Sequence, residues 1–183
     1  MRSTRITLLA CLLTALIYAA GEALAGIPNV EVVTLLTFIS GFLLGPWWGM
    51  VVGAAGMGAH SLFNALGTVA PPVWLSQVVC YALIGFCGAW LGPRIAALRT
   101  RTAQALLSAA TGLVLVTLYQ LVVNTVSFTA FAANVPLWTY VWGGLAFAAI
   151  QMVWNAALFF VALPPTLKVL DRARRQLGGK VAA

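Results

Sequence analysis

Residues 94–101, Arg-Ile-Ala-Ala-Leu-Arg-Thr-Arg, separate two long stretches that contain no lysine or arginine, residues 6–93 and 102–167. The other basic residues lie in two clusters, at 2–5 and 168–180. A membrane-spanning helix needs about 20 apolar residues, so the first stretch has room for about four spans and the second for about two. Even numbers of spans put all three clusters on one side, which the positive-inside rule makes the cytoplasmic side. The pattern predicts an all-α integral membrane bundle of six transmembrane helices with both termini cytoplasmic.

The composition agrees with a bundle embedded in a lipid bilayer. The chain is 62% hydrophobic and 7% charged, with a mean hydropathy of +1.00, whereas about a quarter of the residues in soluble domains are charged. The net charge of +7 is divided among three helix ends, which favours contact with anionic lipid headgroups over nucleic-acid binding. With 183 residues, we expect a single membrane domain, residues 1–183, and no second soluble domain.

Turn residues and the basic clusters divide the chain into the six predicted helices. We expect Pro164 and Pro165 to end the last helix, because proline interrupts the helical hydrogen bonds, and a basic cytoplasmic tail, residues 166–183, to follow it. The outer loops, at about 26–29, 65–72 and 127–137, hold no basic residue. The helices are predicted at about residues 6–25, 30–44, 47–64, 73–91, 104–126 and 138–162.

The second predicted helix is too short to cross a bilayer on its own. Its 15 residues rise by about 22 Å, and the hydrocarbon core is about 30 Å thick. Asn29 is a candidate N-cap, and Glu31 would lie near the positive end of the helix dipole. We therefore expect this helix to begin inside a protein-lined vestibule, where a non-helical entry at Ile27 and Pro28 is tolerated.

The amino terminus has an alternative interpretation as a cleavable signal sequence. Arg2 and Arg5 precede an apolar run that ends in Ala23-Leu24-Ala25, which is the arrangement of a secretory signal. Against cleavage, residues 6–25 are long enough to span a membrane and carry a patterned face. Ala15, Ala19 and Ala23 recur every four residues there and allow another helix to approach closely. This strip would either pack within the bundle or dock a partner protein.

Polar residues within the predicted helices gather toward their outer ends. Because a polar side chain facing lipid is costly, we expect these residues to point inward and form a binding site. The alternative is that they are hydrogen-bonding links between helices, which we favour for Gln151 and Asn155. For His60 by itself we favour a contact within the bundle over a role as a metal ligand. The candidate substrate-binding residues are Asn29, Glu31, His60, Asn64, Trp74, Gln77, Tyr81, Gln120 and Asn124.

Several functions lack their motifs in this sequence. The only Gly-Lys pair, Gly179-Lys180, is followed by valine, so no phosphate-binding loop for ATP is present. None of the three acidic residues falls at a predicted helix centre, where proton-driven carriers place carboxylates. We find no nucleophile–base–acid set, and therefore expect no enzyme activity, no catalytic residues, no cofactor and no metal site.

One segment resembles a known family. Gly26-Ile-Pro-Asn-Val-Glu31, then Thr34-Leu-Leu36, then Gly41-Phe-Leu-Leu-Gly-Pro46 and the glycine-rich helix that follows, are similar to the substrate-binding S components of energy-coupling factor (ECF) vitamin transporters. The similarity extends over most of the chain. It implies a multi-pass protein of the prokaryotic cell (inner) membrane that captures a micronutrient outside with high affinity.

The resemblance also implies partners. A transmembrane T component and two cytoplasmic ATPase subunits would reorient and empty the receptor. In that family an Ala-x-x-x-Ala pattern on the first helix docks the T component, and Ala15 to Ala19, extended by Ala23, matches it. Nickel and cobalt members begin with Met-His, whereas Arg2 stands here, so we do not expect a metal substrate.

The sequence indicates the chemical class of the substrate. Aromatic and amide side chains near an outer pocket suit a flat heteroaromatic ring, so we expect a vitamin or vitamin precursor; cobalamin or its benzimidazole fragment is one candidate among several. A strongly anionic substrate is disfavoured because the outer half has no basic residue. Two alternatives remain: a small membrane enzyme using His60 with Glu31, and a membrane assembly or structural protein.

Overall fold

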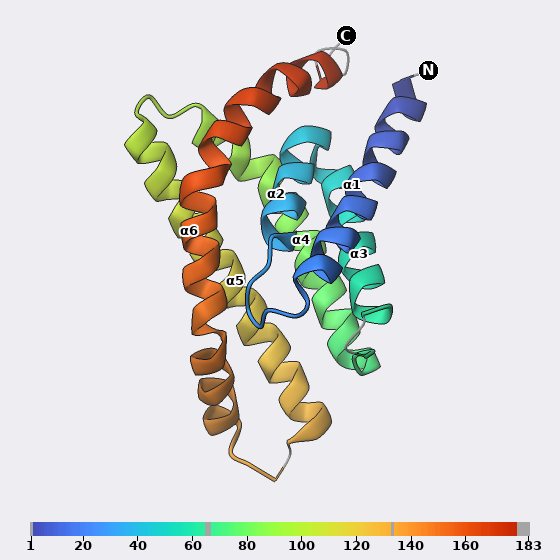
Figure 1. The fold of residues 1–183 in the computed structure, drawn as a ribbon, viewed down its shortest axis with the longest axis vertical. Helices are drawn as coiled ribbons and strands as arrows, with labels where there is room; N and C mark the ends of the chain where they lie inside the picture. Colours follow the sequence, from blue (N-terminus) through green and yellow to red (C-terminus); the bar gives the residue numbers. More distant parts are fainter. Residues whose placement is uncertain (1, 65–66, 133, 179–183) are drawn as a thin grey trace.

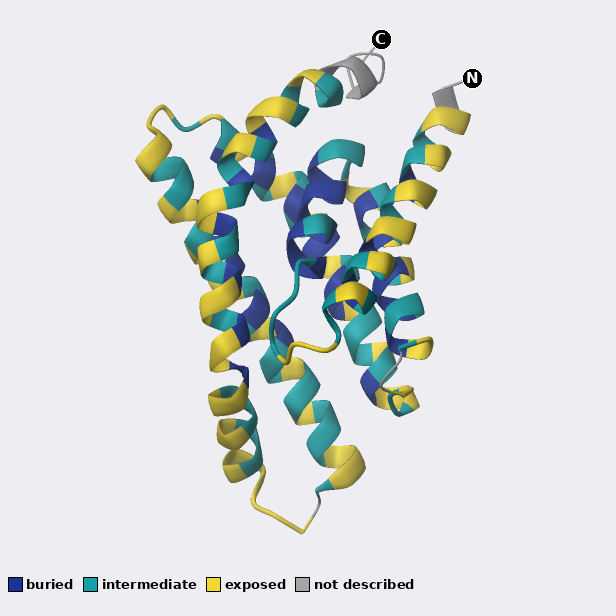
Figure 2. Cartoon of the chain, viewed as in Figure 1, coloured by how far each residue is buried: buried dark blue, intermediate teal, exposed yellow. Residues whose placement is uncertain are grey.

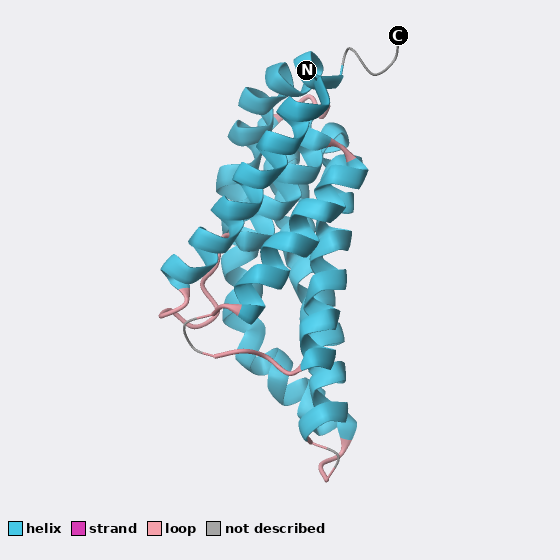
Figure 3. Ribbon diagram, turned by 90° about the vertical axis from the view of Figure 1, so that its right-hand side faces the viewer, coloured by secondary structure: helices cyan, strands magenta, loops and turns pink. Residues whose placement is uncertain are grey.

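The computed structural model describes residues 2–64, 67–132 and 134–178, and within these ranges the chain is entirely helical apart from its connections. The helices run roughly along a common axis (Figure 3). Their order and bounds are α1 Arg2–Leu24, α2 Val33–Leu44, α3 Pro46–Leu62, α4 Pro71–Ala96, α5 Arg101–Phe131 and α6 Leu137–Gly178. The predicted all-α bundle is confirmed.

The short helix α2 forms the centre of the bundle. It contacts all five other helices, which follow one another around it in the order α1, α3, α4, α5, α6. Nine of its 12 residues are buried, from Val33 to Phe42, and Figure 2 shows it as the most continuously buried helix. Phe38, completely buried, packs edge-on against Phe159 of α6 with ring centroids 5.6 Å apart. Hydrophobic burial of α2 therefore stabilises the packing of the helices that precede it and follow it in the chain.

Glycines allow α2, α3 and α4 to pack with their backbones almost in contact. A Cβ atom at Gly41 would lie 1.8 Å from the carbonyl oxygen of Gly85, and one at Gly88 would lie 1.9 Å from that of Phe38. On α3, Gly49 and Gly53 face these two helices in the same way. The small residues therefore form the interhelical contacts that close membrane packing favours.

The outward faces of the bundle are apolar. On α4 the exposed side chains form one stripe of large residues at helical spacing: Leu75, Val79, Leu83, Phe86 and Trp90. Such a continuous apolar surface is untypical of a soluble monomer. Four helical segments are long and apolar enough to cross a membrane: Thr4–Leu24, Pro71–Ala96, Arg101–Phe131 and Leu137–Arg174. The chain is a multi-pass membrane protein.

The helix boundaries differ from the predicted ones in three places. Helix α2 begins at Val33, so Asn29 is not its N-cap; the backbone at Asn29 has a positive φ of 64° instead. Helix α4 continues through Pro93, and α5 begins at Arg101 and extends to Phe131.

The largest correction concerns the carboxyl-terminal end. Pro164 and Pro165 do not end α6, which continues to Gly178 and includes most of the predicted tail. The packing explains this, because Leu163 and Leu167, on either side of the prolines, are buried against the core. Figure 1 shows the helix changing direction toward its end, as expected where two helical N–H donors are missing.

The two ends of the bundle differ in charge. The amino terminus, the α4–α5 connection and the carboxyl-terminal part of α6 lie at the same end (Figure 1), and these three segments carry all the basic clusters. At the opposite end the α5–α6 hairpin projects beyond the other helices (Figure 1). The described basic residues are thus gathered at one end of the bundle.

Candidate functional site

A cavity of about 220 Å³ lies beneath the connection between α1 and α2. Since α1 and α6 do not contact each other in the described part of the chain, residues 25–32 bridge the gap between them (Figure 1). The bridge is fastened to α6 by three hydrogen bonds, from Asn29 Nδ2 to the Phe147 carbonyl (3.1 Å), from Trp154 Nε1 to the Glu31 carbonyl and from Asn155 Nδ2 to the Glu31 carboxylate. The cavity is lined by Gly21, Leu24, Ala25, Ile27, Pro28, Asn29, Val30, Glu31, Val33, Met57, His60, Asn64, Tyr81, Tyr119 and Gln151.

A second cavity of about 430 Å³ adjoins the first. The two share Met57, His60, Asn64 and Tyr119, and the second extends toward the α3–α4 connection and Gln77. Both are lined by helix ends and loops on the side of the bundle away from the basic segments. Small-molecule sites in proteins occupy about 300 to 1,000 Å³, and the combined space falls within that range.

His60 stands at the junction of the two cavities, in the last turn of α3. Its Nδ1 lies 2.8 Å from Glu22 Oε1 of α1, and its Nε2 lies 3.3 Å from Asn64 Nδ2. Because a carboxylate only accepts, Nδ1 donates to Glu22 and Nε2 accepts from the Asn64 amide. A side chain at Gly21 would collide with the ring, since a Cβ there would lie 2.8 Å from Nδ1. His60 is therefore held in one orientation by three residues, Gly21, Glu22 and Asn64.

Glu31 lines the first cavity, but its carboxylate is hydrogen-bonded mainly to residues that hold the fold together. Its Oε2 accepts from the Thr34 amide at 2.8 Å, and its Oε1 accepts from Thr34 Oγ1 and from Asn155 Nδ2, each at 2.7 Å. The carboxylate thus caps the first turn of α2, in place of the predicted Asn29, and ties it to α6. The suggested catalytic pairing of His60 with Glu31 is wrong, because His60 is bonded to Glu22.

Two tyrosines form the aromatic part of the site. Tyr81 and Tyr119 meet edge-to-face with centroids 5.4 Å apart at 87°. The hydroxyl of Tyr81 is 3.1 Å from Thr34 Oγ1, and that of Tyr119 is 3.3 Å from Gln77 Nε2, which donates to it. Since Thr34 donates its own proton to Glu31, Tyr81 donates to Thr34. Tyr119 Oη, by contrast, still has a proton to donate.

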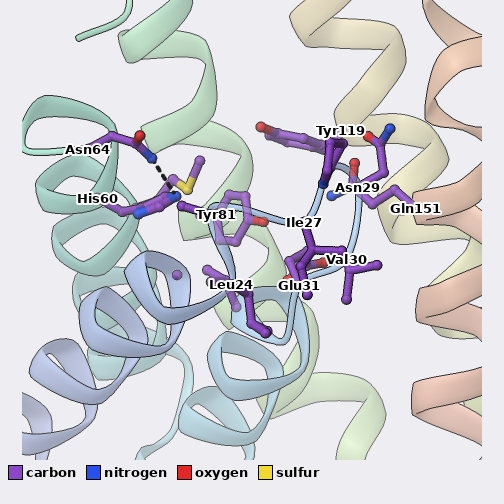
Figure 4. A pocket seen from close by; sticks show the side chains of 15 residues that line it. Leu24, Ile27, Asn29, Val30, Glu31, His60, Asn64, Tyr81, Tyr119 and Gln151 are labelled. Atoms are coloured by element: carbon purple, nitrogen blue, oxygen red, sulfur yellow. Dashed lines mark hydrogen bonds between the residues drawn. The ribbon is translucent and has the colours of Figure 1, made fainter. Parts of the chain in front are cut away.

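Three groups at the first cavity keep hydrogen-bonding capacity that no described residue uses. They are the Tyr119 hydroxyl as a donor, Gln151 Nε2 as a donor and Asn29 Oδ1 as an acceptor. They come from α5, α6 and the 25–32 connection. Figure 4 shows these three residues on the side of the cavity away from His60 and Asn64, with the Tyr119 hydroxyl pointing back toward that side. A bound molecule with both donor and acceptor atoms could satisfy all three.

The structure divides the predicted site residues into two groups. Asn29, Glu31, His60, Asn64 and Tyr81 line the first cavity, and Gln77 lines the second. Three residues line neither: Trp74 donates to the Gly58 carbonyl on α3, and Gln120 and Asn124 bond within the α5–α6 hairpin.

Gln151 was expected to link helices. It does so by accepting a hydrogen bond from Gln120, and it also lines the first cavity. Met57 and the 25–32 backbone were not among the candidates. Met57 lies at helical spacing from the predicted site residues His60 and Asn64, a periodicity that could have identified it.

The charges around the two cavities disfavour an anionic ligand and are compatible with a neutral one. The first cavity is lined by one carboxylate, Glu31, a second from Glu22 is bonded to His60, and no lysine or arginine lines either cavity. No group of three or more His, Cys, Asp or Glu side chains among the described residues could hold a metal ion.

The alanine strip of α1 faces outward. Ala15, Ala19 and Ala23 are all exposed, whereas Ile17 and Gly21 on the opposite face are buried against α3. The prediction that the strip packs within the bundle is therefore wrong for this chain by itself.

Comparison of the chain with protein-family models, curated proteins and solved structures gave no match.

Proposed function

We propose that the protein is the substrate-capture subunit of an ECF-type importer in the prokaryotic inner membrane, with both termini in the cytoplasm. The observation that carries the proposal is the cavity beneath residues 25–32, which presents one acceptor and two donors beside a tyrosine pair. A binding subunit needs this kind of partly apolar pocket with a few oriented polar groups. The segment that resembles the S components, residues 26–46, supplies both the covering loop and the central helix.

The chemistry of the cavity favours a heteroaromatic vitamin or precursor of one or two rings. Aromatic edges and faces at Tyr81 and Tyr119 suit a flat ring, and the absence of basic lining residues favours a neutral or cationic molecule. Among the candidates, a benzimidazole-sized fragment suits a volume of about 220 Å³, whereas a complete corrinoid is larger than this space.

The proposed partners are a T component and two ATPase subunits. The exposed strip Ala15, Ala19 and Ala23 offers a smooth surface on which a partner helix could pack closely. The described chain provides no ATP-binding motif of its own, so energy for release would come from the partners.

Ligand-dependent thermal stability tests the proposal. Purified protein in detergent is heated with a panel of heteroaromatic vitamins and precursors, including benzimidazoles. We expect one class to stabilise the native state by about 2.7 kcal/mol at 100 times its dissociation constant. Tyr119→Phe removes one donor inside the cavity and should weaken binding about tenfold, the equivalent of about 1.4 kcal/mol.

Trp74→Phe is the matched control, because it removes one ring donor outside both cavities. It should leave affinity within about twofold of wild type. Equal losses in Tyr119→Phe and Trp74→Phe, or no stabilisation by any compound, would contradict the proposed site.

The alternative of a membrane enzyme has one observation in its favour, the His60–Glu22 pair at 2.8 Å beside the cavity. A histidine oriented by a carboxylate is a common general base. Turnover of a ligand by the isolated protein would support this alternative, whereas capture of one molecule per chain without conversion supports the receptor.

A further inference from the structure

A second pair of cavities lies at the opposite, basic end of the bundle. Volumes of about 310 and 320 Å³ adjoin each other between the ends of α4, α5 and α6. They share four lining residues, Arg101, Gln104, Pro164 and Lys168. We call the combined space the basic cleft; its upper part reaches Arg99, and its lower part reaches the apolar side chains of α6.

The upper part of the cleft is positively charged. Arg99, Arg101 and Lys168 are exposed, and no hydrogen bond or ion pair between described residues engages their side chains. Asp171 is the one acidic residue in the lining, which leaves an excess of two positive charges. Two other basic residues of this end have partners: Arg94 donates to the Trp90 carbonyl and covers its ring, and Arg174 lies over the ring of Phe42.

The lower part of the cleft is apolar and open to the lipid side. Phe160 and Val161, 43% and 70% exposed, line it together with Ala105 and Pro165. Pro164 and Pro165 have no N–H, so they cannot make the usual helical bonds to the carbonyls of Phe160 and Val161. Toward its end α6 changes direction, and its final turns lie away from α5 (Figure 1).

The position of the cleft matches the boundary between hydrocarbon and headgroups. Arg101 begins α5, and an apolar span follows it directly. The charged part of the basic cleft therefore lies at the depth of the lipid headgroups, and its apolar part lies at the depth of the acyl chains. A molecule that fits both parts carries a negative headgroup on a hydrocarbon chain, and basic pockets between transmembrane helices bind such lipids.

We propose that the basic cleft binds one anionic phospholipid, with its phosphate near Arg99, Arg101 and Lys168 and an acyl chain along Phe160 and Val161. Gln104 is committed to the end of α4, because its Nε2 donates to the carbonyls of Ala96 and Leu98. Its side chain is therefore held in place where the two parts of the cleft meet. The proposal requires only that the chain spans a membrane and does not depend on the identity of any transported molecule.

Native mass spectrometry of the detergent-solubilised protein tests this site. We expect one phosphatidylglycerol to remain bound per chain, and phosphatidylcholine, which has no net charge, to bind at least tenfold more weakly. The triple variant Arg99→Gln, Arg101→Gln, Lys168→Gln should lose at least tenfold in affinity for phosphatidylglycerol, since each basic residue near a membrane surface contributes about fivefold. Val161→Trp, which fills the apolar part without changing charge, should also release the lipid.

The matched control is the triple variant Arg5→Gln, Arg94→Gln, Arg172→Gln, which removes the same charge from the same end but none from the cleft lining. It should keep phosphatidylglycerol within about twofold of wild type. Equal losses in both triple variants would overturn the proposal in favour of diffuse surface attraction. Displacement of the lipid by millimolar inorganic phosphate, or full binding by Val161→Trp, would show a site for a soluble anion instead and also overturn it. Equal binding of phosphatidylcholine would reduce the cleft to an apolar groove.

Discussion

The carboxylate of Glu31 holds the first turn of α2 against α6. It accepts two hydrogen bonds from Thr34 and one from Asn155, whose side chain is completely buried. Bonds of this kind to a charged group are worth about 1.5 to 3 kcal/mol each. One side chain therefore couples the covering loop of the candidate site to the helix at the centre of the bundle.

We predict that Glu31→Gln lowers the free energy of unfolding by about 2 kcal/mol or more, because glutamine has one acceptor oxygen where the carboxylate uses two. Either the Thr34 N–H or the Asn155 amide is then left unsatisfied. The measurement is the thermal unfolding midpoint in detergent without ligand. Glu22→Gln is the control, since its amide oxygen can still accept from His60 Nδ1. A midpoint for Glu31→Gln no lower than that of Glu22→Gln would show that the cap is dispensable.

At the scale of the elements, α2 is stable because α3 and α4 approach it at glycines. Twelve residues, about 18 Å of helix, are too short to span a membrane, so α2 depends on its neighbours for burial. The contacts at Gly41 and Gly88 leave no room for even a methyl group. This explains why glycine, an unfavourable helix residue by about 1 kcal/mol, recurs in three adjacent helices.

Gly85→Ala should lower the free energy of unfolding by about 3 kcal/mol, because the new methyl group would lie 2.1 Å from the Gly49 carbonyl oxygen and force two helices apart. Gly143→Ala on α6 is the control, as nothing lies within 4 Å of its Cβ position. That variant should be unchanged or more stable by about 0.5 to 1 kcal/mol. Unfolding midpoints of the two variants decide the matter, and similar values would refute close packing at Gly85.

The outward alanine strip is a surface of α1 that the other helices leave uncovered. If the proposed function holds, Ala19→Trp should abolish uptake in cells while ligand affinity of the isolated protein stays within a few-fold of wild type. Leu83→Trp, on the lipid-facing stripe of α4, should affect neither. Loss of uptake and affinity together in Ala19→Trp would argue that the ring disturbs the receptor itself and not a partner contact.

For the whole molecule, the end-to-end separation of charge predicts the orientation in the membrane. All three basic segments lie at one end (Figure 1), and the candidate site lies toward the other. Lysine and arginine are retained on the cytoplasmic side, so the cavity beneath residues 25–32 would open outward. Reversal of this orientation would turn a capture site into a cytoplasmic one.

Single cysteines in a background lacking Cys11, Cys80 and Cys87 test the orientation in intact cells. Thr68→Cys and Asn134→Cys, in exposed outer connections, should react with an impermeant maleimide. Thr100→Cys and Arg172→Cys, exposed at the basic end, should react only after the membrane is opened. Outside labelling at Thr100 would reverse the proposed orientation.

The sequence by itself determined the helical class, the positions of the long apolar helices and the gathering of basic residues. Hydrophobic length and charge are properties of a continuous segment, and the bilayer selects for them one segment at a time. The shortness of the second helix could be predicted for the same reason. Within the site, polar residues at helical spacing placed His60, Asn64 and Tyr81 on inward faces, because exposure of these groups to lipid is costly.

Only the tertiary structure decided which of these residues share a cavity and what each one does. Glu31 caps α2 because Asn155, 124 residues away, meets its carboxylate, and Tyr119, Gln151 and Asn29 converge from three separate segments. The prolines of α6 do not stop it, because Leu163 and Leu167 are held in the core on both sides. Local rules predict a break there, but the burial of side chains against distant helices contributes more than the two hydrogen bonds that the prolines remove.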